Sequence, residues 1–244
     1  MVGIGPGGAE HITPAVRRAI EESTVVVGYR TYLSFIEDIL KDKTIYSFGM
    51  TEEIARCSLA LRLAGEGKVV TLVSSGDPGI YGMAGLVLEL NRKFRVEDIE
   101  ILPGVTAISA CAARVGAPLM HDFAVISLSD LLTPWEVIEK RLECAARGDF
   151  VIALYNPKSK KRTEQIKRAE AIIKKYRSPS TPVAIVTSAC REGETVVLTE
   201  LDGFTAHPIS MLSVVIIGNS QTRREGNLLI TPRGYGEKYK DVTG

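Results

Sequence analysis

The chain has 244 residues, of which 45% are hydrophobic and 24% charged, so it is long enough for one large domain or two modest ones. Its formal net charge of +1 argues against a protein that mainly coats nucleic acid, and its longest apolar runs are far too short to span a bilayer. We therefore expect neither a nucleic-acid partner nor a membrane partner.

The four cysteines, Cys57, Cys111, Cys144 and Cys190, lie far apart and form no C-x-x-C pair. Each has apolar or small neighbours, so we expect buried free thiols rather than metal ligands or disulfides. Free thiols are typical of a reducing compartment, and the first residues contain no basic and apolar leader segment. We therefore expect a cytoplasmic protein without a bound metal.

The chain begins with a predicted strand, residues 1–4, that enters a glycine-rich loop. Residues 3–8 satisfy G-x-G-x-x-G, which would suggest a dinucleotide site. In such a site the second glycine leads directly into a helix, whereas here Pro6 follows it. The first helix is predicted to begin only at Thr13-Pro14, a good N-cap and first-turn pair.

The second predicted strand, residues 24–28, lacks the acidic residue that would hold a ribose. Tyr29 and Arg30 follow it instead. Because Arg30 could meet a ribose phosphate, a nicotinamide-dependent enzyme stays an alternative.

A helix is predicted over residues 51–64, with Gly65 as its C-cap. The apolar, β-branched run 69–73 predicts a buried strand, and apolar residues at helical spacing predict a helix over 83–90. Between them lies the loop 74–82, which is rich in glycine and lies at the carboxyl edge of the sheet. Open α/β folds bind ligands at this edge, but Asp, Pro and Gly also favour an ordinary turn, so both interpretations stay open.

A further strand is predicted over residues 99–102, followed by a turn and a helix of small side chains over 103–113. Small residues permit tight burial of a helix, and they also let a ligand lie against its start at Thr106 and Ala107. The first half thus has three strand ends rich in Gly, Pro and small residues. None carries the G-x-x-x-x-G-K-[ST] phosphate cradle.

The pattern restarts near residue 116, so we predict two domains, 1–117 and 118–244. Residues 123–126 predict a new first strand. Residues 133–136 form a sequence capping box with Pro at the first helical position, which predicts a helix to about Arg147.

The second half continues with predicted strands at residues 150–154 and 182–187. The segment 158–162, which is rich in lysine and arginine, is predicted to start a helix. Positive side chains at a helix N-terminus oppose the helix dipole unless an anion is near. Residues 194–201 and 211–218 predict strands without intervening helices. The fold class is therefore α/β, with two αβα domains, the first with a mainly parallel sheet and the second with a mixed sheet.

No common catalytic constellation emerges from the residues alone. The three histidines, His11, His121 and His207, are widely separated, and neither G-x-S-x-G nor H-E-x-x-H occurs. Of these, His11 lies in the first glycine-rich edge and His121 at the domain junction, so either could face a cleft.

Three ordered motifs nevertheless coincide with a known family. Residues 3–7, 75–82 and 103–107 resemble the signatures of the tetrapyrrole methylases, and this resemblance covers nearly the whole chain. Residues 127–136 and 155–162 resemble the precorrin-3B C17-methyltransferase branch, including its cobalt-factor III counterpart.

The resemblance implies two α/β domains with an active-site cleft between them, S-adenosylmethionine as cofactor, and a homodimer. Residues of the first domain would hold the methionine and ribose portions, and two residues of the second would hold the adenosine side. The implied cofactor residues are Pro6, Ser75, Gly76, Asp77, Ile80, Tyr81, Gly82, Thr106, Ala107, Asn156 and Ala189.

The resemblance assigns no acid/base group, because uroporphyrinogen methylases have a proposed aspartate base where this chain has Tyr29. Tyr29 and His11 are therefore the candidate catalytic residues. The substrate implied by the resemblance is a tetrapyrrole with many carboxylates, which needs cationic partners. The candidates are Arg30, Lys158, Lys160, Arg162 and Arg191.

The implied reaction is methylation of a corrinoid precursor, precorrin-3B or cobalt-factor III, at C17 with ring contraction in cobalamin biosynthesis. Positioning of the two reactants and exclusion of water would be the main contributions of the protein. Three alternatives stay open: another methylase of the superfamily acting on a protein or ribosomal RNA, an NADP-dependent oxidoreductase, and a non-catalytic cofactor sensor.

Overall fold

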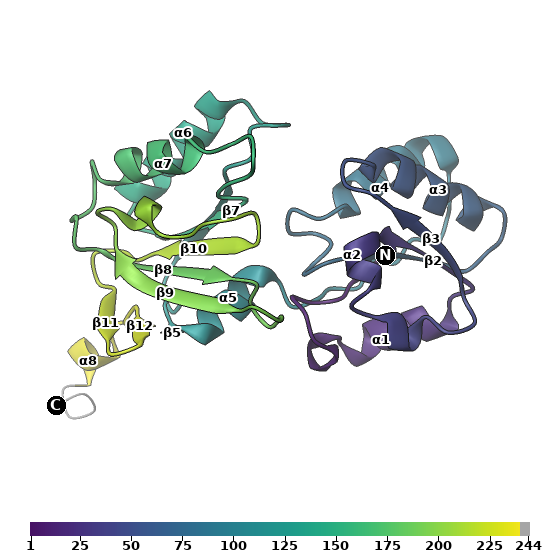
Figure 1. Cartoon of the computed structure of the whole chain (residues 1–244), viewed down its shortest axis with the longest axis horizontal. Helices are drawn as coiled ribbons and strands as arrows, with labels where there is room; N and C mark the ends of the chain where they lie inside the picture. The colour runs from purple at the N-terminus through teal and green to yellow at the C-terminus, as the bar shows by residue number, and fades with distance from the viewer. Residues whose placement is uncertain (240–244) are drawn as a thin grey trace. The chain divides into compact units, whose positions relative to one another are not determined.

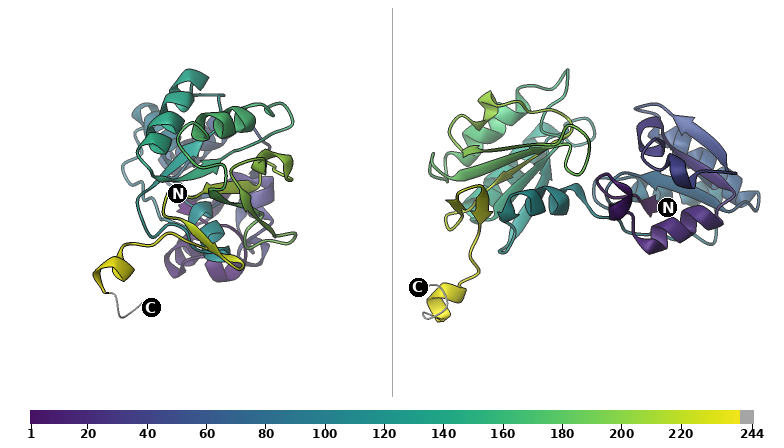
Figure 2. Two further views of the ribbon diagram at one scale, coloured as in Figure 1. Left: turned by 90° about the vertical axis from the view of Figure 1, so that its left-hand side faces the viewer. Right: turned by 60° about the horizontal axis from the view of Figure 1, so that its bottom comes forward.

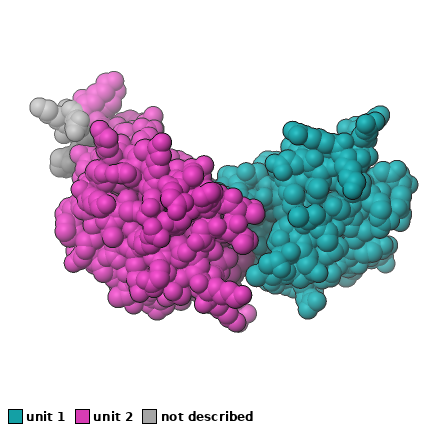
Figure 3. Space-filling model, turned by 90° about the horizontal axis from the view of Figure 1, so that it is seen from above, with its two compact units in different colours: residues 1–107 teal, residues 108–244 magenta. Residues whose placement is uncertain are grey.

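The computed structural model describes residues 1–239 and divides the chain into two compact units, Met1–Ala107 and Ile108–Gly244 (Figure 3). The predicted boundary between residues 117 and 118 lies further along the chain, and residues 240–244 of the predicted second domain lie outside the described residues. Strand β5 (Gly116–Ala117) pairs in parallel with β12 (Leu228–Ile230), which explains why the segment before residue 118 groups with unit 2.

Unit 1 contains a four-stranded sheet in the order β1-β4-β2-β3, in which every pairing is parallel (Figure 1). This confirms the parallel sheet predicted for the first half. Buried parallel strands carry continuous apolar runs because both of their faces are covered, as the three successive valines at 25–27 illustrate. The strands are β1 (Val2–Gly3), β2 (Val25–Tyr29), β3 (Thr44–Phe48) and β4 (Val70–Ser74).

Helices cover both faces of this sheet (Figure 1). On one face, α1 packs its Val16 and Ile20 against Val26, whereas on the other α3 and α4 pack against Val25 and Val27. The helices are α1 (Pro14–Glu22), α2 (Arg30–Leu33), α3 (Glu53–Gly65) and α4 (Ala84–Phe94), with the 3₁₀ turns η1 (Ala9–His11) and η2 (Glu37–Ile39).

The predicted start of α1 is confirmed: Thr13 is its N-cap, and the Thr13 hydroxyl accepts a hydrogen bond from the Val16 N–H at 3.2 Å. Two other predictions are wrong. Gly65 is the last helical residue of α3 rather than its C-cap. The left-handed backbone conformation that favours glycine after a helix occurs two residues later, at Gly67. Residues 99–102 form a single bridge to Val2 instead of a strand, because β1 beside them has only two residues.

Unit 2 contains a mixed sheet, as predicted, with five strands in the order β6-β7-β10-β8-β9. The β6–β7 pairing is parallel and the other pairings are antiparallel. The strands are β6 (Phe123–Ser127), β7 (Val151–Tyr155), β8 (Pro182–Thr187), β9 (Thr195–Glu200) and β10 (Ser213–Ile217). A smaller sheet joins β5 and β12 to β11 (Arg223–Glu225).

One face of the mixed sheet packs against α6 and α7, and α5 lies on the other side (Figures 1 and 2). The core of the first face combines Ile152 and Leu154 of β7 with Leu142 of α6. The helices are α5 (Ala107–Arg114), α6 (Trp135–Arg147), α7 (Gln165–Ile173) and α8 (Tyr235–Lys238), with the 3₁₀ turn η3 (Phe204–Ala206).

Two helix starts in unit 2 differ from prediction. Pro134 is the N-cap of α6 and no side chain caps this helix, so the sequence capping box does not form. The basic segment 158–162 is irregular, and α7 begins after it at Gln165. The charges of that segment therefore do not oppose the dipole of a first helical turn.

The four cysteines are free, but only Cys57 and Cys111 are buried, whereas Cys190 is half-buried and Cys144 is exposed. The expectation of four buried thiols is thus wrong for Cys144 and Cys190. Burial raises the pKa of Cys57 to about 11 and that of Cys111 to about 12, which keeps both protonated at neutral pH. None of the helices within residues 1–239 is long and apolar enough to cross a membrane.

Candidate functional site

Three loops of unit 1 meet at the carboxyl ends of β1 and β4. They are residues 3–8, 74–82 and 103–107, which contain the three motifs found in the sequence. Gly5 and Gly76 form an isolated antiparallel bridge in which each backbone N–H donates to the other carbonyl, at 3.2 and 2.7 Å. Motifs separated by about seventy residues in the sequence are thereby held together by main-chain atoms.

Glycine is required at the centre of this junction because the backbones almost touch. A Cβ on Gly104 would lie 2.2 Å from the Gly76 carbonyl oxygen and 2.4 Å from that of Gly3. A Cβ on Gly3 would lie 2.5 Å from the Gly76 oxygen. Each distance is far below any normal contact, and the obstructing atoms belong to the backbone, so no side-chain rotation can relieve the clash.

Asp77 joins two of the loops. Its Oδ1 accepts a hydrogen bond from the Gly79 N–H at 2.7 Å, and its Oδ2 accepts one from the Gly104 N–H at 3.1 Å. The first bond closes a local Asx turn, and the second crosses to the loop after residue 102. Both oxygens of this predicted cofactor residue therefore contribute to the shape of the loops.

The remaining predicted cofactor residues of unit 1 belong to the same junction and differ in exposure. Tyr81 has a left-handed backbone conformation (φ +54°), which is uncommon outside glycine and marks a tightly constrained turn. Pro6 and Gly76 are buried, Ser75, Thr106 and Ala107 are half-buried, and Ile80, Tyr81 and Gly82 are exposed.

The two candidate catalytic residues lie near the ends of β2 and β1. Tyr29 is the last residue of β2, and its ring packs edge-on against Tyr32 at a centroid distance of 5.0 Å. His11 lies in η1, where its backbone oxygen would be 2.9 Å from a Cβ on Gly5. Its Nδ1 is 3.2 Å from Glu10 Oε1, close enough for an ion pair, although the pair is not aligned as a hydrogen bond.

The carboxyl end of β2 also carries two arginines, one of which the sequence analysis missed. Arg30 is exposed and begins α2. Arg56 of α3 is only 3% exposed, and its Cζ lies 6.0 Å from the centroid of the Tyr29 ring. The signal for Arg56 was its spacing, since Arg56, Ala60 and Leu63 follow an i, i+4, i+7 stripe on the buried face of the helix.

In unit 2, Asn156 lies just after β7 with a left-handed backbone (φ +49°). Its Nδ2 donates to Ser127 Oγ at 2.9 Å, and its carbonyl oxygen accepts from Arg162 Nη2 at 2.8 Å. Arg162 Nη1 also donates to Ser129 Oγ at 3.4 Å. Burial lowers the pKa of the Arg162 guanidinium. Arg162 thus fastens the loop after β7 to the loop after β6, rather than presenting a free cation.

The other predicted residues of unit 2 follow the ends of β7 and β8. Ala189 is buried and follows Ser188, another residue with a left-handed backbone (φ +54°). Arg191 is half-buried and its N–H donates to the Ser188 carbonyl at 3.0 Å. Lys158 is half-buried and Lys160 is exposed. Within unit 2 the predicted residues therefore follow the carboxyl ends of β7 and β8, the two strands that pair with β10.

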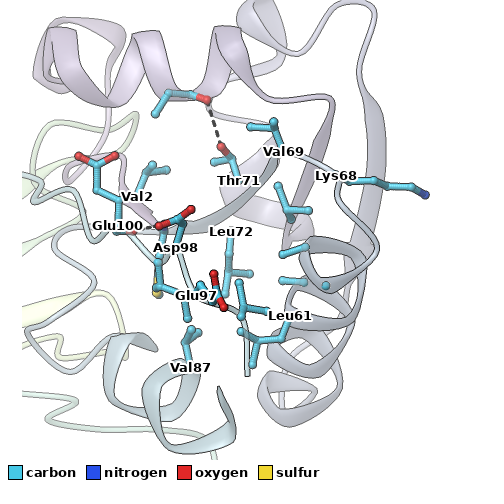
Figure 4. A pocket seen from close by; sticks show the side chains of 18 of the residues that line it. Val2, Leu61, Lys68, Val69, Thr71, Leu72, Val87, Glu97, Asp98 and Glu100 are labelled. Carbon is cyan, nitrogen blue, oxygen red and sulfur yellow. Dashed lines mark hydrogen bonds between the residues drawn. The ribbon is translucent and has the colours of Figure 1, made fainter. Parts of the chain in front are cut away.

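A pocket of about 930 Å³ lies at the opposite end of the unit 1 sheet (Figure 4). Apolar side chains such as Leu61 and Val87 line it together with the acidic residues 97, 98 and 100. Its wall includes the first residues of β4, whereas the last residue of β4 begins the loop 74–82 at the other end of the strand. The pocket is therefore separate from the candidate site, and no sequence motif predicted it.

Comparisons with known proteins agree with the motifs. The tetrapyrrole (corrin/porphyrin) methylases match the chain over residues 1–204. The chain is 52% identical over 244 residues to the cobalt-factor III methyltransferase of Priestia megaterium, covering 98% of this chain but 45% of that relative. It is 48% identical over 236 residues to the probable cobalt-factor III C(17)-methyltransferase of Salmonella typhimurium, covering 96% of this chain and 98% of that relative. The solved structure of the methyltransferase CobJ is similar with a TM-score of 0.89 and 39% identity, over 95% of this chain and 98% of that one.

Proposed function

The chain belongs to the tetrapyrrole methylase family, and on this basis we propose that it is an S-adenosylmethionine-dependent methyltransferase. The substrate would be cobalt-factor III or precorrin-3B, methylated at C17 with ring contraction in cobalamin biosynthesis. The observation that carries the proposal is the junction of three glycine-bearing loops, in which Gly3, Gly76 and Gly104 meet through their backbones.

The chemistry of these loops suits this cofactor. Residues 74–82 and 103–107 contain no lysine or arginine, so they place no like charge beside a sulfonium. They offer backbone groups and small side chains instead of a phosphate cradle. The proposed cofactor residues are Pro6, Ser75, Gly76, Asp77, Ile80, Tyr81, Gly82, Thr106 and Ala107, with Asn156 and Ala189 for the adenosine portion.

S-adenosylmethionine would supply an electrophilic methyl group. The protein would contribute chiefly by positioning, because a methyl transfer to carbon needs the two reactants aligned and water excluded. Tyr29 and His11 are the proposed groups for proton transfer. Arg30, Lys158, Lys160 and Arg191 are proposed partners for substrate carboxylates. Arg162 would contribute indirectly, since it fixes the Asn156 carbonyl.

An NADP-dependent oxidoreductase is the less favoured alternative. Pro6 follows the second glycine of the G-x-G-x-x-G pattern, and α1 begins only at Pro14. Dinucleotide sites bind the pyrophosphate at a helix N-terminus directly after the glycine-rich loop. Within residues 1–239 of this chain, no α-helix begins at that point.

We also propose a cytoplasmic homodimer. Four free thiols suit a reducing compartment, and the homodimer rests on the family resemblance alone. Sedimentation velocity on the purified chain measures the oligomeric state directly.

Turnover tests the proposed function. The purified chain, incubated anaerobically with S-adenosylmethionine and either cobalt-factor III or precorrin-3B, should yield a product heavier by one methyl group in mass spectrometry. S-adenosylhomocysteine should raise the melting temperature, and NADPH should not. Stabilisation by NADPH alone, without methylation of either ring, would favour the oxidoreductase.

Asp77 provides a prediction at the cofactor loops. Asp77→Ala removes both hydrogen bonds that hold the Gly79 and Gly104 N–H groups. Since a hydrogen bond to a charged group contributes about 1.5–3 kcal/mol, we expect S-adenosylhomocysteine affinity to fall by about ten- to a hundredfold. Calorimetric titration measures the change.

Asp77→Asn is the matched variant, because its amide oxygen can keep one of the two bonds, and it should lose less affinity than Asp77→Ala. Circular dichroism should show both variants folded. An Asp77→Ala variant with the wild-type dissociation constant would refute the role of this carboxylate.

A further inference from the structure

The guanidinium of Arg56 is buried in unit 1 without enough partners. The residue is 3% exposed and lies on the stripe of α3 that also carries the buried Ala60 and Leu63. Among residues 1–239, one carboxylate forms an ion pair with it: Glu53 Oε1 is 3.4 Å from Arg56 Nη2, and the Glu53 side chain is itself 47% exposed. A long, charged side chain on the inner face of a helix is uncommon and requires an explanation.

Most hydrogen-bond donors of this guanidinium are unused. Among residues 1–239, neither Nε nor Nη1 of Arg56 has a hydrogen-bond acceptor. These two atoms carry three of the five N–H groups of an arginine. Buried polar groups are almost always paired, and a buried charge with unpaired donors costs more than a neutral group.

Arg177 of unit 2 shows how this chain satisfies an arginine of similar burial. Its guanidinium donates to the carbonyl oxygens of Ala146, Phe150 and Gly218 and forms an ion pair with Asp149 at 2.6 Å. Arg177 therefore has a structural role that its contacts explain. Arg56 has no comparable set, so its burial points to an acceptor that is not part of the described chain.

The position of Arg56 indicates where that acceptor would come from. Its Cζ lies 6.0 Å from the ring centroid of Tyr29, the half-buried last residue of β2. The carboxyl edge of a parallel sheet is where α/β folds bind ligands, and the exposed Arg30 follows at the same edge. A substrate group arriving at this edge would need the Tyr29 ring, which lies against the guanidinium, to move aside.

We propose that Arg56 is a substrate-binding residue that receives one rim carboxylate of the tetrapyrrole. A carboxylate matches a guanidinium in charge and planar geometry and would satisfy its unused donors by charge-assisted hydrogen bonds. This inference rests on the proposed function, and it adds a residue to the cations named there. Tyr29 then covers the site until the substrate enters.

Direct binding of a polycarboxylate porphyrin tests this proposal without turnover. Uroporphyrin III is titrated into wild type, Arg56→Gln and Arg62→Gln, and porphyrin fluorescence reports the dissociation constant. Arg62 is the matched control: it lies on the same helix, is 57% exposed and pairs with Glu66. We expect Arg56→Gln to weaken uroporphyrin binding about tenfold or more, with Arg62→Gln and S-adenosylhomocysteine affinity unchanged.

A second variant separates binding from a structural role. Arg56→Met keeps the length of the side chain and removes the unpaired charge, so it should unfold at the same urea concentration as wild type or a higher one. If Arg56 were structural, this variant would instead unfold at lower urea. Arg56→Lys, which keeps the charge without the planar fork, should retain part of the affinity, and it replaces Arg56→Gln if that variant fails to fold.

The outcomes are distinct from those for the function itself. Absence of methylation by wild type refutes the proposed function, while uroporphyrin binding still reports on Arg56. Equal uroporphyrin affinity in wild type and Arg56→Gln, no uroporphyrin binding by wild type, or a change of sedimentation coefficient in Arg56→Gln would each overturn the assignment. The last result would mean that the guanidinium serves a second copy of the chain.

Discussion

Replacing Gly104 by alanine is expected to abolish cofactor binding and to lower the free energy of unfolding by about 3 kcal/mol or more. The added Cβ would lie 2.2 Å from the Gly76 carbonyl oxygen and 2.4 Å from that of Gly3. Since both obstacles are backbone atoms of neighbouring loops, the junction must open. Urea denaturation measures the stability, and calorimetric titration with S-adenosylhomocysteine measures the binding.

Gly85→Ala is the matched control for this experiment. Gly85 lies in α4, and a Cβ there would meet nothing within 4 Å. Alanine should therefore leave binding unchanged and raise stability by about 0.5–1 kcal/mol, as expected for glycine replaced inside a helix. Equal cofactor affinity in Gly104→Ala and Gly85→Ala would show that the loop junction does not form the cofactor site.

The second large effect concerns Arg177. Arg177→Ala should cost about 3–5 kcal/mol of unfolding free energy, because it takes the buried donor away from three carbonyl oxygens. It also breaks the ion pair with Asp149, whose carboxylate keeps its two hydrogen bonds from Ser220. The Arg177 side chain is buried, and this burial lowers the pKa of its guanidinium. Fluorescence of Trp135, which lies in the same unit, follows the urea transition.

Arg62→Ala provides the comparison for Arg177, since its i, i+4 pair with Glu66 is exposed and should contribute less than about 1 kcal/mol. Removing Asp149 as well, in Arg177→Ala/Asp149→Ala, should cost less than the sum of the two single losses, because the two residues share one ion pair. A loss below about 1 kcal/mol for Arg177→Ala would show that the buried network is not needed for stability.

The strongest predictions from sequence were those with a local cause. The valines of β2 and β4 form apolar runs bounded by polar residues, and Thr13-Pro14 is a cap that needs only its own helix. Strand β3 was not predicted, because this edge strand has an exposed Ile45 and little apolar signal. Residues 99–102 looked like a strand, but their pairing depended on the length of β1.

The site was predictable as a set of motifs but not as a set of contacts. The sequence indicated Asp77 as a cofactor residue, yet its bond to Gly104 joins residues 27 positions apart and needs the fold to be seen. Arg162 was predicted as a partner of substrate carboxylates, and nothing in the sequence indicated that it also holds the loops after β6 and β7. Arg56 looked like one more helix charge, and its burial with unpaired N–H donors is what distinguishes it.

The pocket at the amino ends of the unit 1 strands has a practical consequence for inhibitor discovery. Its volume of about 930 Å³ is in the range that accommodates drug-sized compounds. A compound bound there would raise the melting temperature by mass action while leaving the loops around Gly76 untouched. Screening by melting temperature alone would therefore collect silent binders, and each hit needs a counter-assay that measures displacement of S-adenosylhomocysteine.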